Sequence, residues 1–128
     1  MSAPIIYIDN SEILEGQFES LRSVMDELAQ FVEVNEPKLH AYRIYFNENT
    51  SRMTVIHIHP DADSLELHMR VAGPLFPKFA KYVKLLTIDL YGAPSEYAIE
   101  QLRQKAKALG GGTVRTHSLH KGFARFSI

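Results

Sequence analysis

The residues best suited to chemistry are concentrated in one stretch, from Arg52 to Arg70, which holds three of the six histidines. His57 and His59 lie two residues apart in a segment where apolar and polar side chains alternate. Such alternation predicts a β-strand, in which residues two apart point to the same side of the sheet. Two imidazoles on one side either line a polar pocket or supply ligands to zinc, copper, iron or nickel. A metal would need a third ligand, for which Asp89 is the candidate.

The third histidine, His68, falls on the next predicted element. The spacing Asp63-x-x-Glu66 is that of a capping box and predicts the start of a helix. His68 shares a stripe of this helix with Leu65 and Ala72. A histidine on such a stripe is either a packed core residue or a pocket residue that binds a ligand or accepts a proton.

A second group of polar side chains is predicted on the same sheet face as the two strand histidines. An arginine beside tyrosines can bind a carboxylate or a phenolate. The alternative is that Arg43 and Asp89 neutralise each other. We therefore predict a ligand pocket lined by Tyr7, Arg43, Tyr45, His57, His59 and Asp89, with His68 as the candidate catalytic residue if it faces this pocket and is not packed in the core.

Composition narrows the class of protein. The chain has 128 residues, enough for one domain with a core, and its net charge of −1 argues against a general nucleic-acid binder. No run approaches the roughly 18 apolar residues of a membrane span. There is no cysteine, which excludes disulfides, thiolate metal sites and cysteine nucleophiles. Because residues 1–4 also lack a basic signal-peptide start, we expect a cytoplasmic protein.

The charges are unevenly distributed. Residues 1–36 contain eight acids and one base, while residues 101–128 contain six bases and no acid. The two ends either form separate solvated faces or contact each other, within one chain or between subunits.

Periodicity predicts a β-α-β-β-α-β order over the first ninety residues. Apolar residues at steps of four and three predict a first helix from Leu14 that ends before Pro37. Gly110–Gly112 follows a helix and therefore has the polarity of a helix stop, not of a phosphate loop. The predicted strands are 5–9, 38–47, 52–59, 83–91 and 113–120, and the predicted helices are 14–36, 61–72 and 94–109.

This order is that of the ferredoxin-like α+β unit, an antiparallel sheet with both helices on one face. We expect residues 1–91 to form this core and residues 92–128 to extend it within one domain. The opposite sheet face, which holds the predicted pocket, is too apolar to stay wet. We predict that a second subunit covers it, so that a homodimer with twofold symmetry encloses a barrel. The residues expected to face the helices are Ile6, Ile8, Ile44, Phe46, Ile56, Ile58, Leu86, Ile88 and Leu90.

The βαββαβ order, the long amphipathic first helix and the segment Ser64–His68 resemble the antibiotic biosynthesis monooxygenase family of dimeric α+β barrels. The resemblance covers roughly residues 4–91. In that family the helix after the third strand commonly carries a histidine in a pattern like ALDAHLxSPHF. His68-Met69 matches the first histidine and its neighbour. Gly73–Phe76 resembles the end of the pattern, two residues late and with Leu75 where a second histidine often stands.

The resemblance implies a cofactor-independent monooxygenase of a small aromatic or polyketide-like molecule, with His68 assisting deprotonation. The family's haem-degrading members use an Asn, a Trp and a His, and this chain has no Trp. The alternative is a non-catalytic dimeric barrel that binds a small ligand or another protein. We predict no cofactor, no nucleic acid and no membrane partner.

Overall fold

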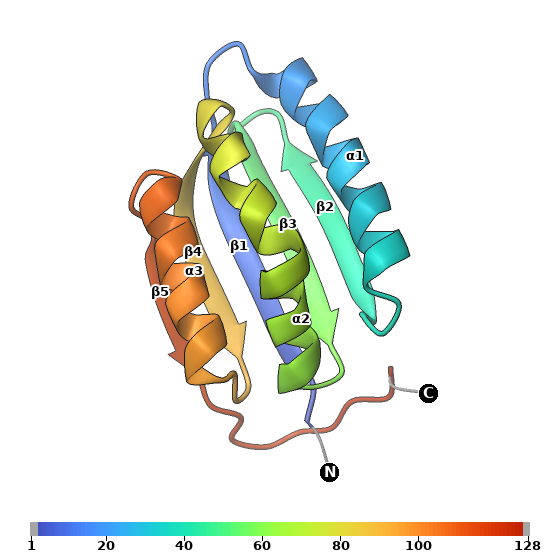
Figure 1. Cartoon of the computed structure of the whole chain (residues 1–128). Coiled ribbons are helices and arrows are strands. Elements are labelled where there is room, and N and C mark those ends of the chain that lie inside the picture. Colours follow the sequence, from blue (N-terminus) through green and yellow to red (C-terminus); the bar gives the residue numbers. More distant parts are fainter. Residues whose placement is uncertain (1–2, 127–128) are drawn as a thin grey trace.

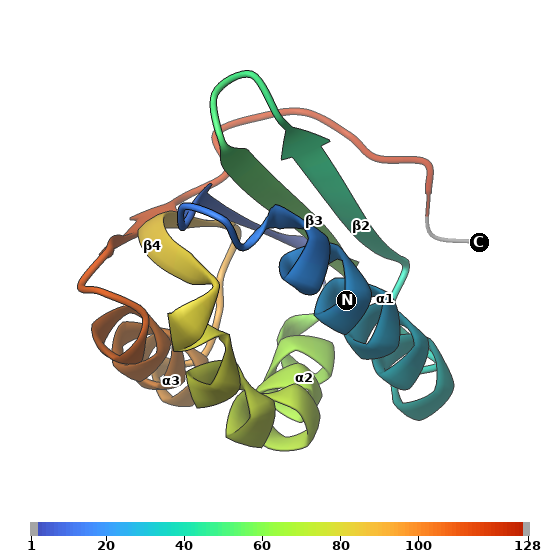
Figure 2. The same ribbon diagram turned by 90° about the horizontal axis from the view of Figure 1, so that it is seen from above.

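The computed structural model describes residues 3–126, which form a five-stranded sheet with three α-helices on one face (Figure 1; Figure 2). The strands follow the order β2-β3-β1-β4-β5 and are antiparallel except for the pair β4 and β5. The first four strands have the predicted ferredoxin-like arrangement, so the α+β fold class is confirmed. The elements are β1 (Ile5–Ile13), α1 (Phe18–Asn35), β2 (Ala41–Asn47), β3 (Arg52–His59), α2 (Ala62–Ala72), the 3-10 segment η1 (Gly73–Lys81), β4 (Val83–Tyr91), α3 (Glu96–Ala108) and β5 (Thr113–His117).

Helix α1 buries the apolar stripe that predicted it, although it starts at Phe18 and not at Leu14. The difference arises because β1 continues to Ile13 instead of stopping at the predicted residue 9. Glu36 caps the other end, with its backbone N–H donating to the Val32 carbonyl. The stripe packs α1 on the sheet through Leu21, Met25, Leu28 and Val32.

Helix α2 is capped by Asp61, and the prediction of a cap at Asp63 was wrong. The Asp61 carboxylate accepts a hydrogen bond from the Ser64 backbone N–H at 2.9 Å. Asp61 has the extended backbone of an N-cap residue (φ −163°), whereas Asp63 already lies inside the helix.

The C-terminal extension is part of the same layered structure. Helix α3 packs beside α2, and β5 pairs with β4 and forms the edge of the sheet. Gly112 permits this connection, because a Cβ there would lie 2.7 Å from the Leu85 carbonyl oxygen. Residues 118–126 then cross one end of the sheet, from β5 toward the start of β2, where Phe126 meets His40 (Figure 1).

The predicted assignment of sheet faces was wrong for β1 and β3. Tyr7, His57 and His59 are buried on the helix-covered face, while the isoleucines at 6, 8, 56 and 58 are half-buried on the open face. Residues that pair directly across two strands lie on the same face of the sheet. Tyr7 pairs with His57 and Ile8 with Ile56, so an error in the face of one strand brings the same error in the other. Alternation alone separates two sets of side chains without saying which set the helices cover.

The assignment was correct for β2 and in part for β4. Ile44 and Phe46 pack under α1, and Ile88 and Leu90 belong to the buried core. Leu85, not the predicted Leu86, lies in that core. The pairing register of β1 and β4 shifts between Asn10 and Ser11, and such a bulge breaks strict alternation along the pair.

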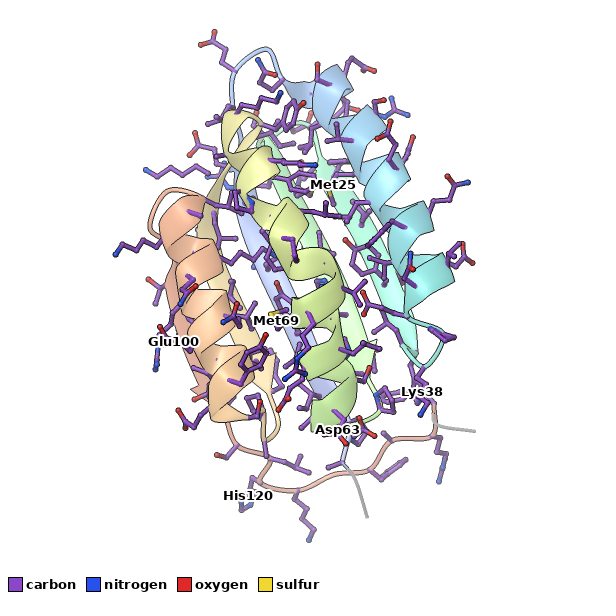
Figure 3. The ribbon with its side chains drawn as sticks, viewed as in Figure 1. Met25, Lys38, Asp63, Met69, Glu100 and His120 are labelled. Atoms are coloured by element: carbon purple, nitrogen blue, oxygen red, sulfur yellow. The ribbon has the colours of Figure 1, made fainter. Side chains whose placement is uncertain are left out.

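The core consists of two apolar clusters side by side beneath the helices. One lies mainly beneath α2 and α3 and includes Met69, and the other lies beneath α1 and includes Met25. Figure 3 shows both methionines among the side chains between the helices and the sheet. The buried histidines and their polar neighbours lie along the boundary between these two clusters.

Candidate active site

The three histidines of the stretch Arg52–Arg70 do come together, in the layer between sheet and helices. The His68 ring lies 5.1 Å from His57 and 5.7 Å from His59, measured between centroids. The His57 and His59 rings are nearly parallel, as expected for neighbours on one side of β3. All three side chains are at most 1% exposed.

His68 forms a buried pair with a carboxylate from α1. Its Nδ1–H donates to Glu36 Oε2 at 2.8 Å and lies 3.0 Å from Oε1. The two side chains are only 1% and 2% exposed. A carboxylate on Nδ1 fixes the tautomer in which Nε2 carries the lone pair. His68 is therefore oriented to accept a proton at Nε2, and the imidazolium so formed would be stabilised by Glu36.

His57 presents a second proton-accepting nitrogen. Its Nδ1 lies 3.0 Å from the backbone carbonyl oxygen of Tyr7, which can only accept, so Nδ1 carries the hydrogen. Burial holds the pKa of His57 well below its ordinary value, and the nearby His68 and Lys105 lower it further. The ring stacks on Tyr7 at 3.9 Å and meets Tyr42 edge-on at 4.8 Å. His57 is thus a neutral imidazole held between two phenol rings.

His59 is the third neutral imidazole. Its Nδ1 shares a hydrogen bond of 2.8 Å with Ser64 Oγ. Its Nε2 is the one enclosed side-chain nitrogen or oxygen without a partner among residues 3–126. Burial lowers the pKa of His59 to about 3. An enclosed polar atom without a partner typically costs about 1–3 kcal/mol, a cost that functional sites often carry.

A second buried polar group faces the histidines across the core. The Lys105 ammonium donates to Tyr7 Oη at 2.7 Å and to Asp9 Oδ2 at 3.0 Å. The two ionic side chains are 10% and 4% exposed. Burial and the neighbouring Asp9 raise the pKa of the Tyr7 phenol well above its ordinary value, so this tyrosine stays protonated. The pair Asp9–Lys105 also shows that the acidic and basic ends of the chain contact each other within one molecule.

Some of these groups line a small cavity of about 30 Å³. That space holds about one water molecule. Apolar residues of both core clusters form most of its wall. Its polar lining consists of Asp9, Ser11, Tyr42, His57, His68 and Lys105.

A larger groove lies on the surface next to this cavity, between α1 and η1. It has a volume of about 640 Å³ and mainly apolar walls, with Glu27, Lys78 and Lys81 among its residues. Leu28 and Phe79 line both the groove and the cavity. These two side chains therefore form the partition between the surface and the buried histidines.

The other predicted pocket residues lie on the open face of the sheet. Arg43 donates to Tyr45 Oη at 3.3 Å, and both side chains are exposed. The predicted Arg43–Asp89 pair was wrong, because β3 and β1 separate their strands. Asp89 instead accepts two hydrogen bonds from Arg115, at 2.8 and 2.9 Å, and a third from His117. These bonds hold the pKa of Asp89 below its ordinary value.

Asp89 is therefore not a third metal ligand for the strand histidines. Across residues 3–126, no three or more His, Cys, Asp or Glu side chains are grouped so that they could hold a metal ion. The spacing of His57 and His59 therefore places both rings in the buried cluster and not around a metal ion.

Sequence reasoning missed six polar residues of this cluster: Asp9, Ser11, Glu36, Tyr42, Ser64 and Lys105. Two of them carried a signal. Glu36 lies four residues after Val32 and so continues the buried stripe of α1 past the helix end. Lys105 lies seven residues after the buried Ala98, two helical turns along the same side of α3.

Comparison with known proteins identifies solved structures with a similar fold. The sequence matches no protein-family model and no curated protein. Among solved structures it is similar to MupZ from Pseudomonas fluorescens (TM-score 0.74, 17% identity, 98% of each chain). It is also similar to SnoaB, a cofactor-independent oxygenase from Streptomyces nogalater (TM-score 0.60, 13% identity, 73% of this chain and 96% of that one). A third is a candidate antibiotic biosynthesis monooxygenase from Caulobacter crescentus (TM-score 0.56, 17% identity, 73% and 92%).

The chain has the fold of the antibiotic biosynthesis monooxygenases. This similarity confirms the predicted resemblance in fold. Because the sequence identities are low, the reaction has to be inferred from the chain's own residues. Within residues 3–126 no helix has the length and apolar character needed to cross a bilayer.

Proposed function

We propose that the protein is a cofactor-independent monooxygenase that oxidises a small aromatic or polyketide-like molecule between its sheet and helices. The observation that carries the proposal is the buried Glu36–His68 pair, whose free Nε2 belongs to a cavity-lining residue. A buried carboxylate–imidazole pair is suited to general-base catalysis. The oxygenase fold supports the same conclusion.

The proposed reaction needs only a base and a substrate that is easily oxidised once ionised. His68 Nε2 takes a proton from a phenolic or enolic group, and the resulting anion reacts with O₂. One oxygen atom becomes a ring carbonyl and the other leaves as water, with all four electrons supplied by the substrate. The apolar walls and the phenol ring of Tyr42 hold the substrate ring and keep bulk water away.

Substrate entry requires the partition to move. The cavity of about 30 Å³ is too small for an aromatic ring, whereas the groove beyond Leu28 and Phe79 is not. We propose that the groove receives the substrate and that Phe79, on η1, turns aside to admit it. Phe79→Ala should then join groove and cavity and raise the rate of substrate binding.

The proposed assembly is a cytoplasmic homodimer paired through the open sheet faces. The support is the row of half-buried isoleucines on that face. We retain the division into a monooxygenase-type core, 1–91, and an extension, 92–128. Several similar structures match 70–73% of this chain, which agrees with such a division.

Oxygen uptake with a panel of hydroxylated polycyclic aromatics tests the proposal. His68→Gln should lower kcat by about 10²–10⁴-fold, and Glu36→Gln by a smaller factor, because it leaves the base in place without its orienting charge. His117→Gln, on the open face, is the matched control. Unchanged turnover in a folded His68→Gln protein would remove His68 from the mechanism.

The closed cavity favours a second candidate, a binding protein without catalysis. A thermal-shift screen with the same aromatics, followed by chromatography of the recovered ligand, separates the two. Stabilisation by a ligand that is recovered unchanged in air would support binding alone.

A further inference from the structure

Two buried groups of opposite charge lie near one cavity, Lys105 in its wall and Glu36 bonded to the wall residue His68. Glu36 lies behind His68, and the Lys105 ammonium lies beside Asp9 and Tyr7. Phe76 lies between them, with its ring 6.0 Å from the His68 ring and 4.2 Å from Lys105 Nζ. Both His68 and Lys105 line the cavity.

This arrangement matches the charges that deprotonation creates. When His68 takes a proton, an imidazolium forms against the Glu36 carboxylate, and a negative charge forms on the substrate. An ammonium group has three N–H donors. Hydrogen bonds to Tyr7 and Asp9 use two of them, no hydrogen-bond acceptor among residues 3–126 takes the third, and the ammonium also lies over the Phe76 ring.

We infer that Lys105 is a further catalytic residue, whose remaining N–H receives the anionic oxygen of the bound substrate. The inference rests on the proposed function and specifies its substrate class: the molecule carries a phenol or an enolisable carbonyl whose oxygen becomes anionic. The proton moves from the substrate to His68 Nε2, and no bond to Lys105 breaks. Asp9 and Tyr7 hold the ammonium in position.

Lys105 comes from α3, outside the βαββαβ order. A lysine that merely neutralised Asp9 would contribute to stability alone. A lysine that receives an anion should also discriminate between charged and neutral ligands of the same shape. Binding of such a pair of ligands therefore separates the two roles.

The test compares 4-nitrophenolate with its neutral isostere 4-nitroanisole, at one pH above the pKa of the phenol. The Phe79→Ala protein is the host, since it opens the partition, and binding is followed by the absorbance shift of each probe. Asp9→Asn with Lys105→Met removes the whole ion pair and leaves no unpaired buried charge. Asp89→Asn with Arg115→Met removes a pair on the open face and is the control.

We expect the Asp9/Lys105 double variant to bind 4-nitrophenolate about ten- to a hundredfold more weakly, as for loss of a charge-assisted hydrogen bond. Its affinity for 4-nitroanisole should change less than about twofold, and the control pair should alter neither affinity. Equal weakening of both probes, unchanged phenolate binding, or no binding of either probe to the host would overturn the inference. Lys105→Arg, which keeps the charge, should retain preference for the phenolate.

This experiment does not depend on turnover. Phenolate selectivity without oxygen uptake would count against the proposed oxygenase reaction while supporting Lys105 as the anion-binding group. Oxygen uptake that survives loss of the ion pair would overturn the role of Lys105 and leave His68 as the base.

Discussion

The two faces of the sheet both combine polar and apolar residues, but in different surroundings. The helix-covered face buries Tyr7, His57 and His59, together with Asp9 and its partner Lys105. The open face carries a row of half-buried isoleucines and an ion pair whose arginine side chain is 53% exposed. Buried polar groups cost free energy unless they are paired, and apolar surface is rarely left to water without a purpose.

Under the proposed function, each face has a different role. On the covered face, polar groups at the boundary of two apolar clusters provide the means for proton transfer. On the open face, isoleucine surface provides the means for association. Four changes would break or sharpen this contrast.

The largest effect on stability is expected at the buried ion pair. Asp9→Ala leaves the Lys105 ammonium buried without its counter-charge and should lower the free energy of unfolding by about 3–5 kcal/mol. Asp89→Ala, the matching change on the open face, should cost several-fold less, because the exposed Arg115 can return to water. Urea denaturation of both variants measures the difference, and equal losses would contradict it.

A charge on the open face should act on assembly and not on folding. Ile56→Asp should weaken the homodimer by about a hundredfold or more, because an unpaired carboxylate would be buried between subunits. Size-exclusion chromatography with light scattering gives the mass across a dilution series. Val34→Asp, at a residue of α1 that is 75% exposed, is the control. A wild-type protein that is monomeric at micromolar concentration would refute the dimer.

The neutral histidines of the covered face should make stability fall with acid. In the unfolded chain an imidazole takes up a proton below pH about 6.5, whereas in the fold the pKa of His59 is lowered to about 3. The unfolded state therefore binds more protons as the pH drops through this window. The free energy of unfolding therefore falls by about 1.4 kcal/mol per pH unit for each such histidine. His57, whose pKa is also lowered, adds to the same trend.

The slope of the unfolding free energy against pH identifies the residue. His59→Gln should remove about 1.4 kcal/mol per pH unit from it, and His117→Gln should leave it unchanged. A slope that His59→Gln does not alter would show that His59 titrates normally in the fold.

The smallest effect is expected for the terminal arm. Residues 118–126 form no helix or strand, and Leu119 and Phe123 are 74% and 81% exposed. Deleting residues 118–128 should change the free energy of unfolding by less than about 0.5 kcal/mol. Denaturation of the truncated chain measures this, and a large loss would show that the arm stabilises the fold.

Local patterns in the sequence determined most of the secondary structure. The steps of four and three in α1, the alternation in β2 and β3 and the glycines after α3 depend on neighbours in the chain, and each appears where it was expected. The order of these elements also restricted the topology to a ferredoxin-like sheet, because short connections permit few arrangements. His57, His59 and His68 lie on one strand and the helix after it, but the predicted sheet faces kept the two strand histidines away from the helices, so their approach to His68 did not follow from the sequence.

Only the tertiary structure decided which side of β1 and β3 faces the helices. The alternation of side chains along a strand puts Tyr7 and Ile8 on opposite faces, and likewise His57 and Ile56. Which of the two faces the helices cover depends on how the helices pack on the sheet. A prediction from hydrophobicity alone places the isoleucine face under the helices. The helices cover the histidines instead, and Glu36 at the end of α1 and Lys105 from α3, both distant in the chain, pair with His68 and Asp9 in the same buried layer.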